Sequence, residues 1–298
     1  MKLKNLKTTT LLLLALIVSS CEKAVFDDNT DTPSESDANV ILHVASLEQI
    51  PFSTTDGTRA QQDITELCSR LNFVIFDNQG NKVKTLAQKA ADSSFGTASF
   101  NIEPGSYQLA IIAHNSDGTA TVTAADKITF PNNLVTDTFY YYGTLVVGSE
   151  PQTYELQLQR VVSMFRLVLT QPLSSSVHKL KFYYTGGSST FSAVSGYGCV
   201  QSRQTVNLTV SSGQQTFDVY TFPHEQNDLL KITITALDAQ DNAIDERVFE
   251  DVPITRNQIT RYTGSLFGNS SGGVEESSTN LIRMTADGEW AATNDHQF

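Results

Sequence analysis

The chain has 298 residues, of which 17% are charged and 40% are hydrophobic, so it is long enough for two domains that each bury a core. Acidic residues outnumber basic ones by 32 to 20, which gives a net charge of −12. Removal of Lys2, Lys4 and Lys7 with a leader segment would leave 17 basic residues and a net charge of −15. Because affinity for nucleic acid comes from lysine and arginine neutralising phosphates, this charge excludes a nucleic-acid partner.

Residues 1–20 have the layout of a secretory signal peptide. Three lysines precede the apolar run Leu11–Val18, which would rise only about 12 Å as a helix and is too short to cross a hydrocarbon core of ~30 Å. Ser19 and Ser20 stand directly before Cys21, and small residues at these places resemble a bacterial lipobox. We therefore predict that Cys21 is lipidated and anchors the protein in the membrane. The alternative is an incidental cysteine after an ordinary signal peptide.

Residues 21–38 are acidic and rich in serine, threonine and asparagine, a composition typical of a flexible tether. In the body of the chain, apolar and polar residues alternate, which predicts half-buried strands. Apolar residues at helical spacing over 64–71 predict one short helix, and Asp63 with Glu66 resembles a capping box at its start. The expected strands include Asn39–Leu47, Leu71–Phe76, Tyr107–His114, Tyr154–Gln159, Phe165–Leu169 and Phe217–Tyr220.

Two segments of similar sequence, 73–86 and 234–249, each combine a strand, a turn rich in Asp, Asn, Gln or Gly, and a returning strand. The repeated plan predicts an all-β fold of two sandwich domains in tandem, with a junction near residues 159–160. The predicted organisation is a signal peptide (1–20), a tether (21–38), an N-terminal sandwich (39–158), a C-terminal sandwich (159–268) and a linker with a terminal hairpin (269–298).

The tail differs from the body. Leu281–Thr285 and Glu289–Ala292 flank Asp287-Gly288, a strong signal for a short hairpin. A detached strand pair at the end of a sandwich protein either covers an edge of its own sheet or is lent to a neighbour. The candidate donor-strand residues are Leu281, Ile282, Met284 and Trp290.

Cys68 and Cys199 are the thiols that remain after Cys21. A disulfide between them is possible in an exported protein, but two isolated cysteines do not make a disulfide framework. We favour the interpretation that they are two small buried hydrophobic residues.

Catalytic motifs of the GxSxG, GxGxxG and HExxH types are absent from the sequence. Asp238, Asp241 and Asp245 lack the alternation and the closing glutamate of a calcium loop, so a solvated turn is the better interpretation. Tyr140–Tyr142 could stack on a carbohydrate, but we expect a strand whose alternate rings enter the core while the middle ring stays outside. The sequence therefore predicts no enzyme, no cofactor and no metal site.

Several segments together resemble Bacteroidales fimbrial proteins. The lipobox with its acidic tether and Thr58-Arg59-Ala60 before a short helix belong to this resemblance. So do the segments LNFVIFDNQGNKV, PGSYQLAIIAHN, LQRVVSMFRLVLT and PITRNQITRYTGSLFG. The resemblance covers roughly residues 38–268 and is closest to the FimB-type fimbrial anchor and subunit family within the fimbrillin group. It implies two transthyretin-like β-sandwich domains and a lipoprotein that anchors, caps or builds a surface fimbria used in adhesion.

The resemblance also implies a mechanism of assembly and a set of partners. In polymerising fimbrillins an Arg-specific protease removes the lipid and the first strand, and Arg59 sits at the corresponding place. The freed groove could accept the tail of another fimbrial subunit. An anchor keeps its lipid in the outer membrane and keeps its first strand. Further expected partners are a host or bacterial surface ligand, and the alternative function is a glycan-binding surface lipoprotein.

Overall fold

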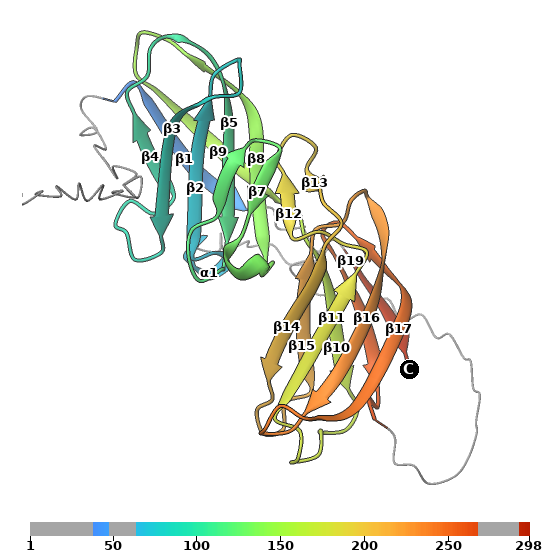
Figure 1. The fold of residues 1–298 in the computed structure, drawn as a ribbon. Coiled ribbons are helices and arrows are strands. Elements are labelled where there is room, and N and C mark those ends of the chain that lie inside the picture. Colours follow the sequence, from blue (N-terminus) through green and yellow to red (C-terminus); the bar gives the residue numbers. More distant parts are fainter. Residues whose placement is uncertain (1–37, 48–63, 268–291) are drawn as a thin grey trace, which may run out of the picture. The chain divides into compact units, whose positions relative to one another are not determined.

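The computed structural model describes residues 38–47, 64–267 and 292–298, and every structural statement below concerns this part of the chain. Strands dominate it (Figure 1), and its helical pieces are α1 (Ile64–Leu67) and the short 3-10 helix η1 (Pro131–Asn133). The predicted all-β fold class is therefore confirmed. The expected helix over 64–71 is one turn long, because β2 already begins at Arg70. Within the described ranges, no helix is both long and apolar enough for a membrane span.

The first sheet along the chain has seven strands in the order β3-β2-β5-β8-β9-β1-β4. Only two residue pairs join β8 to β9, so the strands divide into two layers, β3-β2-β5-β8 and β9-β1-β4. Buried side chains from both layers share one cluster, which includes Leu42 of β1 and Phe73 of β2. This is a β-sandwich. Its strands are β1 (Val40–Leu47), β2 (Arg70–Phe76), β3 (Lys82–Lys89), β4 (Thr97–Phe100), β5 (Gly105–His114), β8 (Thr138–Val147) and β9 (Gln152–Arg160).

The later strands form a second pair of sheets, with the orders β14-β11-β16-β17 and β15-β10-β18-β19. Their facing side chains share a separate cluster, which includes Phe165 of β10 and Phe182 of β11. The strands are β10 (Ser163–Leu169), β11 (Lys179–Thr185), β14 (Arg203–Thr209), β15 (Thr216–Thr221), β16 (Asn227–Leu237), β17 (Ala243–Thr255), β18 (Gln258–Gly264) and β19 (Ala292–Gln297).

The two sandwiches repeat one topology. Taken in chain order, β1, β2, β3, β4, β5, β8 and β9 correspond to β10, β11, β14, β15, β16, β17 and β18. With this correspondence, the order β3-β2-β5-β8 becomes β14-β11-β16-β17, and β4-β1-β9 becomes β15-β10-β18. In both sandwiches the first strand pairs in parallel with the last strand. Among the strands that the structure describes, β19 has no counterpart in the first sandwich and is an addition at the β18 edge.

The similar hairpins are not equivalent positions of this repeat. Segment 73–86 joins β2 to β3, whereas 234–249 joins β16 to β17, and β16 corresponds to β5. Their likeness comes from the turn. The carboxylate of Asp77 accepts hydrogen bonds from the backbone N–H groups of Gln79 and Asn81, and Asp238 does the same in the second hairpin. The side-chain amides of Asn81 and Asn242 also donate to these carboxylates, and together with the backbone bonds they lower the pKa of Asp77 and Asp238.

A small four-stranded sheet links elements from the two halves of the chain. Its order is β13-β12-β7-β6, and β12 pairs with β7 through Thr190 and Phe191. A third buried cluster contains Phe130, Phe191 and Phe222, and the ring of Phe222 lies 5.3 Å from that of Phe130 and 5.1 Å from that of Phe191. The segments that follow β5 and β11 are therefore packed together. The strands are β6 (Thr121–Ala124), β7 (Lys127–Thr129), β12 (Thr190–Ser192) and β13 (Tyr197–Gly198).

The tyrosine triplet lies in β8, and the prediction of an outward middle ring is wrong. Tyr141 packs against the core of the first sandwich, while Tyr140 and Tyr142 pack against the third cluster. All three are half-buried. Alternation along β8 still holds, but at residues 140–142 both faces of the strand pack against buried clusters, so none of the three rings is fully exposed.

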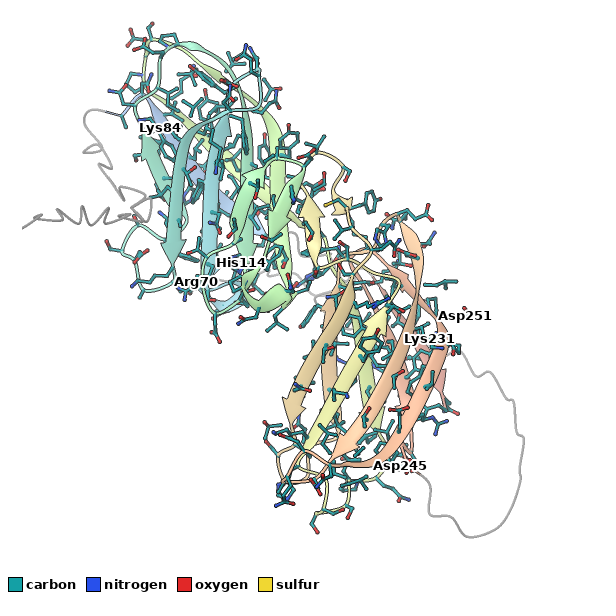
Figure 2. The ribbon with its side chains drawn as sticks, in the orientation of Figure 1. Arg70, Lys84, His114, Lys231, Asp245 and Asp251 are labelled. Carbon is teal, nitrogen blue, oxygen red and sulfur yellow. The ribbon has the colours of Figure 1, made fainter. Side chains whose placement is uncertain are left out.

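Buried polar groups lie close to the point where the chain leaves β9. Arg160, with a side chain only 2% exposed, pairs with Asp137 at 2.8 Å and stacks over the ring of Phe139 at 4.6 Å. His114 of β5 is fully buried and pairs in register with Arg70 of β2; Figure 2 labels both residues at the same end of the first sandwich. Burial and the charge of Arg70 lower the pKa of His114 to about 4.

The two cysteines of the described body are both free thiols. Cys68 is buried, as expected, and burial raises its pKa to about 12. Cys199 is exposed, so the prediction of a second buried hydrophobic residue is wrong. It follows the two-residue strand β13, where the chain leaves the small sheet and turns to the surface.

Candidate interaction site at the first and last strands

The first strand, β1, has an alternating sequence that fits a strand with one face in a core. Val40 and Leu42 are fully buried, while Val44 and Leu47 are 2% and 4% exposed. The residues between them are half-buried. Full burial of an aliphatic side chain contributes about 1.5–3 kcal/mol, so the four together contribute on the order of 6–12 kcal/mol.

Strand β1 lies inside its sheet and not at an edge. It pairs antiparallel with β4, where Leu42 is opposite Ala98, and in parallel with β9, where Leu42 is opposite Tyr154. Asn39, just before the strand, donates from its side chain to the carbonyl of Ile102 at 2.7 Å and accepts from the N–H of Ile102 at 3.0 Å. Loss of β1 would expose two unpaired edges and one apolar groove.

The last strand, β19, covers the free side of β18. The two strands run parallel, with Ile259 opposite Thr293 and Arg261 opposite Asp295. Thr293 is 2% exposed. The guanidinium of Arg261 and the carboxylate of Asp295 lie 3.2 Å apart and are 20% and 13% exposed, so this ion pair is shielded from most of the solvent.

The C-terminal end of β19 is held by aromatic contacts. The rings of His296 and Tyr262 stack at 4.6 Å, and burial lowers the pKa of His296, against the opposing effect of Asp295. Phe298 meets the ring of Phe249 edge-on at 5.1 Å, and the Arg247 guanidinium lies 4.8 Å above the Phe298 ring. These side-chain contacts thus favour one register of β19 along β18.

Gly264 at the end of β18 shows how close this approach is. A Cβ atom at that position would collide with the carbonyl oxygen of Phe298 and lie 3.0 Å from its ring. The backbone N–H of Phe298 donates to the carbonyl of Thr263 at 3.2 Å. A residue larger than glycine at position 264 would therefore displace Phe298 from its place beside β18.

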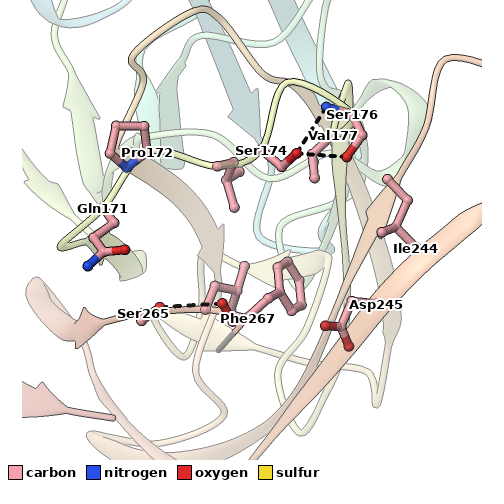
Figure 3. A pocket seen from close by; sticks show the side chains of 11 residues that line it. Gln171, Pro172, Ser174, Ser176, Val177, Ile244, Asp245, Ser265 and Phe267 are labelled. Atoms are coloured by element: carbon pink, nitrogen blue, oxygen red, sulfur yellow. Dashed lines mark hydrogen bonds between the residues drawn. The ribbon is translucent and has the colours of Figure 1, made fainter. Parts of the chain in front are cut away.

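An open pocket of about 570 Å³ lies beside the residues that follow β18 (Figure 3). Phe267 lies on one side of it and Pro172 and Val177 on the other. Among the described residues that line it, Asp245 is the one ionisable group, and its carboxylate accepts from the N–H of Glu246 at 2.7 Å. Two hydroxyl contacts lie in this lining: Ser174 and Ser176 hydrogen-bond to each other at 3.0 Å, and Ser265 donates to the carbonyl of Phe267 at 3.5 Å.

The predicted site residues mostly lie outside the described ranges. This holds for Cys21, for Arg59 and for the donor-strand candidates Leu281, Ile282, Met284 and Trp290. Of the predicted strand Glu289–Ala292, only Ala292 is described, where it begins β19. The sequence interpretation missed β19 itself, because Thr293–Gln297 is polar; the acid at 295 and the aromatic residue at 298 are the signals that could have suggested docking.

The model of the fimbrillin-A associated anchor proteins Mfa1 and Mfa2 matches residues 30–259. The chain belongs to this family. A fimbrial role, as an anchor or as a structural component, follows from that membership, and the predicted resemblance to fimbrial anchor proteins is confirmed. No curated protein matches the chain.

Solved structures that match the chain include the following three proteins. A candidate adhesin from Bacteroides ovatus has 12% identity and a TM-score of 0.45, over 66% of this chain and 88% of that one. The fimbrial anchor protein Mfa2 from Porphyromonas gingivalis has 11% identity and a TM-score of 0.38, over 70% and 80%. A fimbrial assembly protein from Parabacteroides distasonis has 12% identity and a TM-score of 0.38, over 86% and 97%.

Proposed function

We propose that this fimbrial anchor-family protein is held in the outer membrane by lipid on Cys21 and joins other fimbrial subunits by β-strand complementation. In this proposal the fimbria that it anchors or builds supports adhesion to a host or bacterial surface. The family match over residues 30–259 supports the fimbrial role. The seating of β1 between β4 and β9 is the observation that supports strand complementation. The boundaries 39–158 and 159–268 for the two sandwich domains are part of the same proposal.

The N-terminal position of β1 gives the proposed mechanism its physical basis. A protease cut after Arg59 would separate β1 from the rest of the chain while β4 and β9 stayed covalently connected. The empty site would present backbone donors and acceptors from both neighbours and pockets for the side chains that replace Val40, Leu42 and Val44. An extended segment of another subunit, with apolar residues at alternate positions, is the ligand that fits such a groove.

The proposed anchor differs from a polymerising subunit in keeping both its lipid and β1. With β1 in place, the groove is filled and no donor strand can enter it. The N-terminal residue of the surface material distinguishes the two states: an acylated Cys21 identifies the anchor, and Ala60 identifies a chain cut after Arg59.

The lipid anchor is tested by replacing Cys21 with alanine in the producing cell. The parent protein should sediment with membranes and the Cys21→Ala protein should stay soluble, because the acylation site is gone. Cys199→Ala is the matched control, since Cys199 is an exposed thiol of the folded body; it should remain in the membrane fraction. Unchanged partitioning of Cys21→Ala would refute the anchor.

Processing is tested separately by mass spectrometry of the N-terminus. If the chain is cut in cells, Arg59→Ala should abolish the species that begins at Ala60 and should retain β1. An Arg59→Lys variant distinguishes an Arg-specific protease, which should fail on lysine, from a protease of broader specificity. Detection of the same truncated species in both variants would contradict cleavage after Arg59.

A further inference from the structure

The edge of β18 recognises an extended strand with a defined sequence. It takes a small residue opposite Ile259, an acid opposite Arg261 and an aromatic residue beyond Gly264. In the described structure the ligand is β19 of the same chain. Because the contacts are made by side chains as well as backbone, the edge favours this strand and this register over an arbitrary peptide.

The connection between the strands does not confine this recognition to one chain. Strand β18 ends at Gly264 and β19 begins at Ala292, and the two run parallel. The chain must therefore return along a strand of seven residues, which is about 23 Å. Residues 265–291 could extend over about 90 Å. This length allows β19 to reach the β18 edge of a neighbouring molecule as well as its own.

We propose that the β18 edge is a docking site for β19 of a second copy of this chain, so that the C-terminal strands of two molecules can be exchanged. The proposal deepens the proposed function, on which it rests for its biological context, by naming a partner and a site in the second sandwich. Its position is distinct from the β1 groove in the first sandwich. The intramolecular arrangement prevails in dilute solution, because a strand joined covalently to its edge has an effective concentration in the millimolar range. Exchange between copies requires crowding, as on a membrane or fimbria, or a mismatch between a chain's own strand and its own edge.

The first test opens the edge and supplies the strand as a peptide. The acceptor is the chain without residues 290–298, and the probe is a peptide of residues 290–298. Trp290 is the single tryptophan of the protein, so tryptophan anisotropy reports the peptide alone. Saturable binding is expected, and an Asp295→Lys peptide should bind at least about tenfold more weakly. Absence of saturable binding by an acceptor whose circular dichroism shows the parent β-structure would overturn the proposal.

The second test uses full chains and does not depend on a truncated acceptor. Arg261→Glu places an acid opposite Asp295, and Asp295→Arg places a second base opposite Arg261, so each single variant has a mismatched strand and edge. In a 1:1 mixture of the two, exchange between molecules restores opposite charges at both edges. Native mass spectrometry should detect a heterodimer in the mixture, whereas each variant alone and the double variant should be monomeric.

The outcomes separate this inference from the proposed function. A mixture that stays monomeric, while the double variant regains protease protection of its C-terminus, would limit β19 to its own chain and overturn the proposal. Both measurements use purified protein carrying Cys21→Ala, so neither depends on lipidation or fimbria assembly. Conversely, the purified variants could form the heterodimer while fimbriae isolated from cells lack this protein. That result would support strand exchange between copies and would contradict the proposed assembly with fimbrial subunits.

Discussion

The buried histidine of β5 predicts how the stability of this protein responds to acid. His114 is fully buried, its Nδ1 accepts a hydrogen bond from the N–H of Ser116 at 3.1 Å, and its ring meets Phe130 edge-on. The imidazole is therefore held in the neutral form. Its pKa of about 4 in the folded protein compares with an ordinary value of 6.5.

The sign of the effect follows from which state binds the proton. Below pH 6.5 the unfolded chain protonates this histidine, whereas the folded protein does so only near pH 4. The contribution of neutral His114 to the free energy of unfolding is therefore fully present above pH 6.5, and it is lost as the pH falls from 6.5 to 4. Each pKa unit corresponds to about 1.4 kcal/mol, so we expect a loss of about 3 kcal/mol over that window from His114 alone.

Comparison with a variant isolates this contribution. His114→Asn keeps an acceptor for the N–H of Ser116 and removes the titrating group. Between pH 6.5 and 4, its free energy of unfolding should therefore fall by about 3 kcal/mol less than that of the parent. Asp137, whose pKa burial raises, acts in the opposite direction but is present in both proteins and cancels. Urea unfolding at pH 7, 5.5 and 4.5 provides the measurement; parallel pH profiles for parent and His114→Asn would refute the argument.

Three other predictions concern the ion pair, the thiols and the C-terminus. Asp137→Ala leaves the Arg160 guanidinium buried without its carboxylate and should lower the free energy of unfolding by about 3 kcal/mol in urea titrations; a change below about 0.5 kcal/mol would show that solvent screens the pair. A thiol reagent at pH 8 should modify Cys199 in the folded protein and Cys68 only after unfolding, because Cys68 is buried with a pKa of about 12; equal rates would contradict its burial. Gly264→Ala should release the C-terminus and make 292–298 accessible to protease, whereas Gly148→Ala, where an added Cβ meets nothing closer than 3.9 Å, should not.

The strands of the body were predictable because each obeys a local rule. Val40–Leu47 alternates between buried and half-buried residues, and the Asp-x-Gln-x-Asn turns close their hairpins through bonds within five residues. Such signals need no knowledge of distant parts of the chain. For the same reason they misled on the repeat, since a turn with good local chemistry recurs wherever two adjacent strands must be joined.

The features that escaped prediction depend on long-range packing. The expectation that Tyr141 points outward assumed that one face of β8 is exposed to solvent at this position. The sequence near residue 141 does not indicate that one face packs against the core of the first sandwich and the opposite face against the third cluster. Strand β19 is mostly polar, and its pairing relies on Arg261 and Tyr262, which lie more than thirty positions earlier in the sequence. A local pattern carries no information about a partner at that distance.

The topology restricts which strands can be exchanged between molecules. Strand β10 occupies the same central position in the second sandwich as β1 does in the first, yet β10 continues into folded strands on both sides and cannot leave its sheet without unfolding them. Strands β1 and β19 lie at the two ends of the described chain. They differ in cost: removal of β1 breaks two ladders and exposes four buried apolar side chains, whereas removal of β19 breaks one ladder at an edge. Under the two proposals above, exchange of β19 breaks few contacts and would be reversible, whereas a cut after Arg59 would free β1 from the rest of the chain.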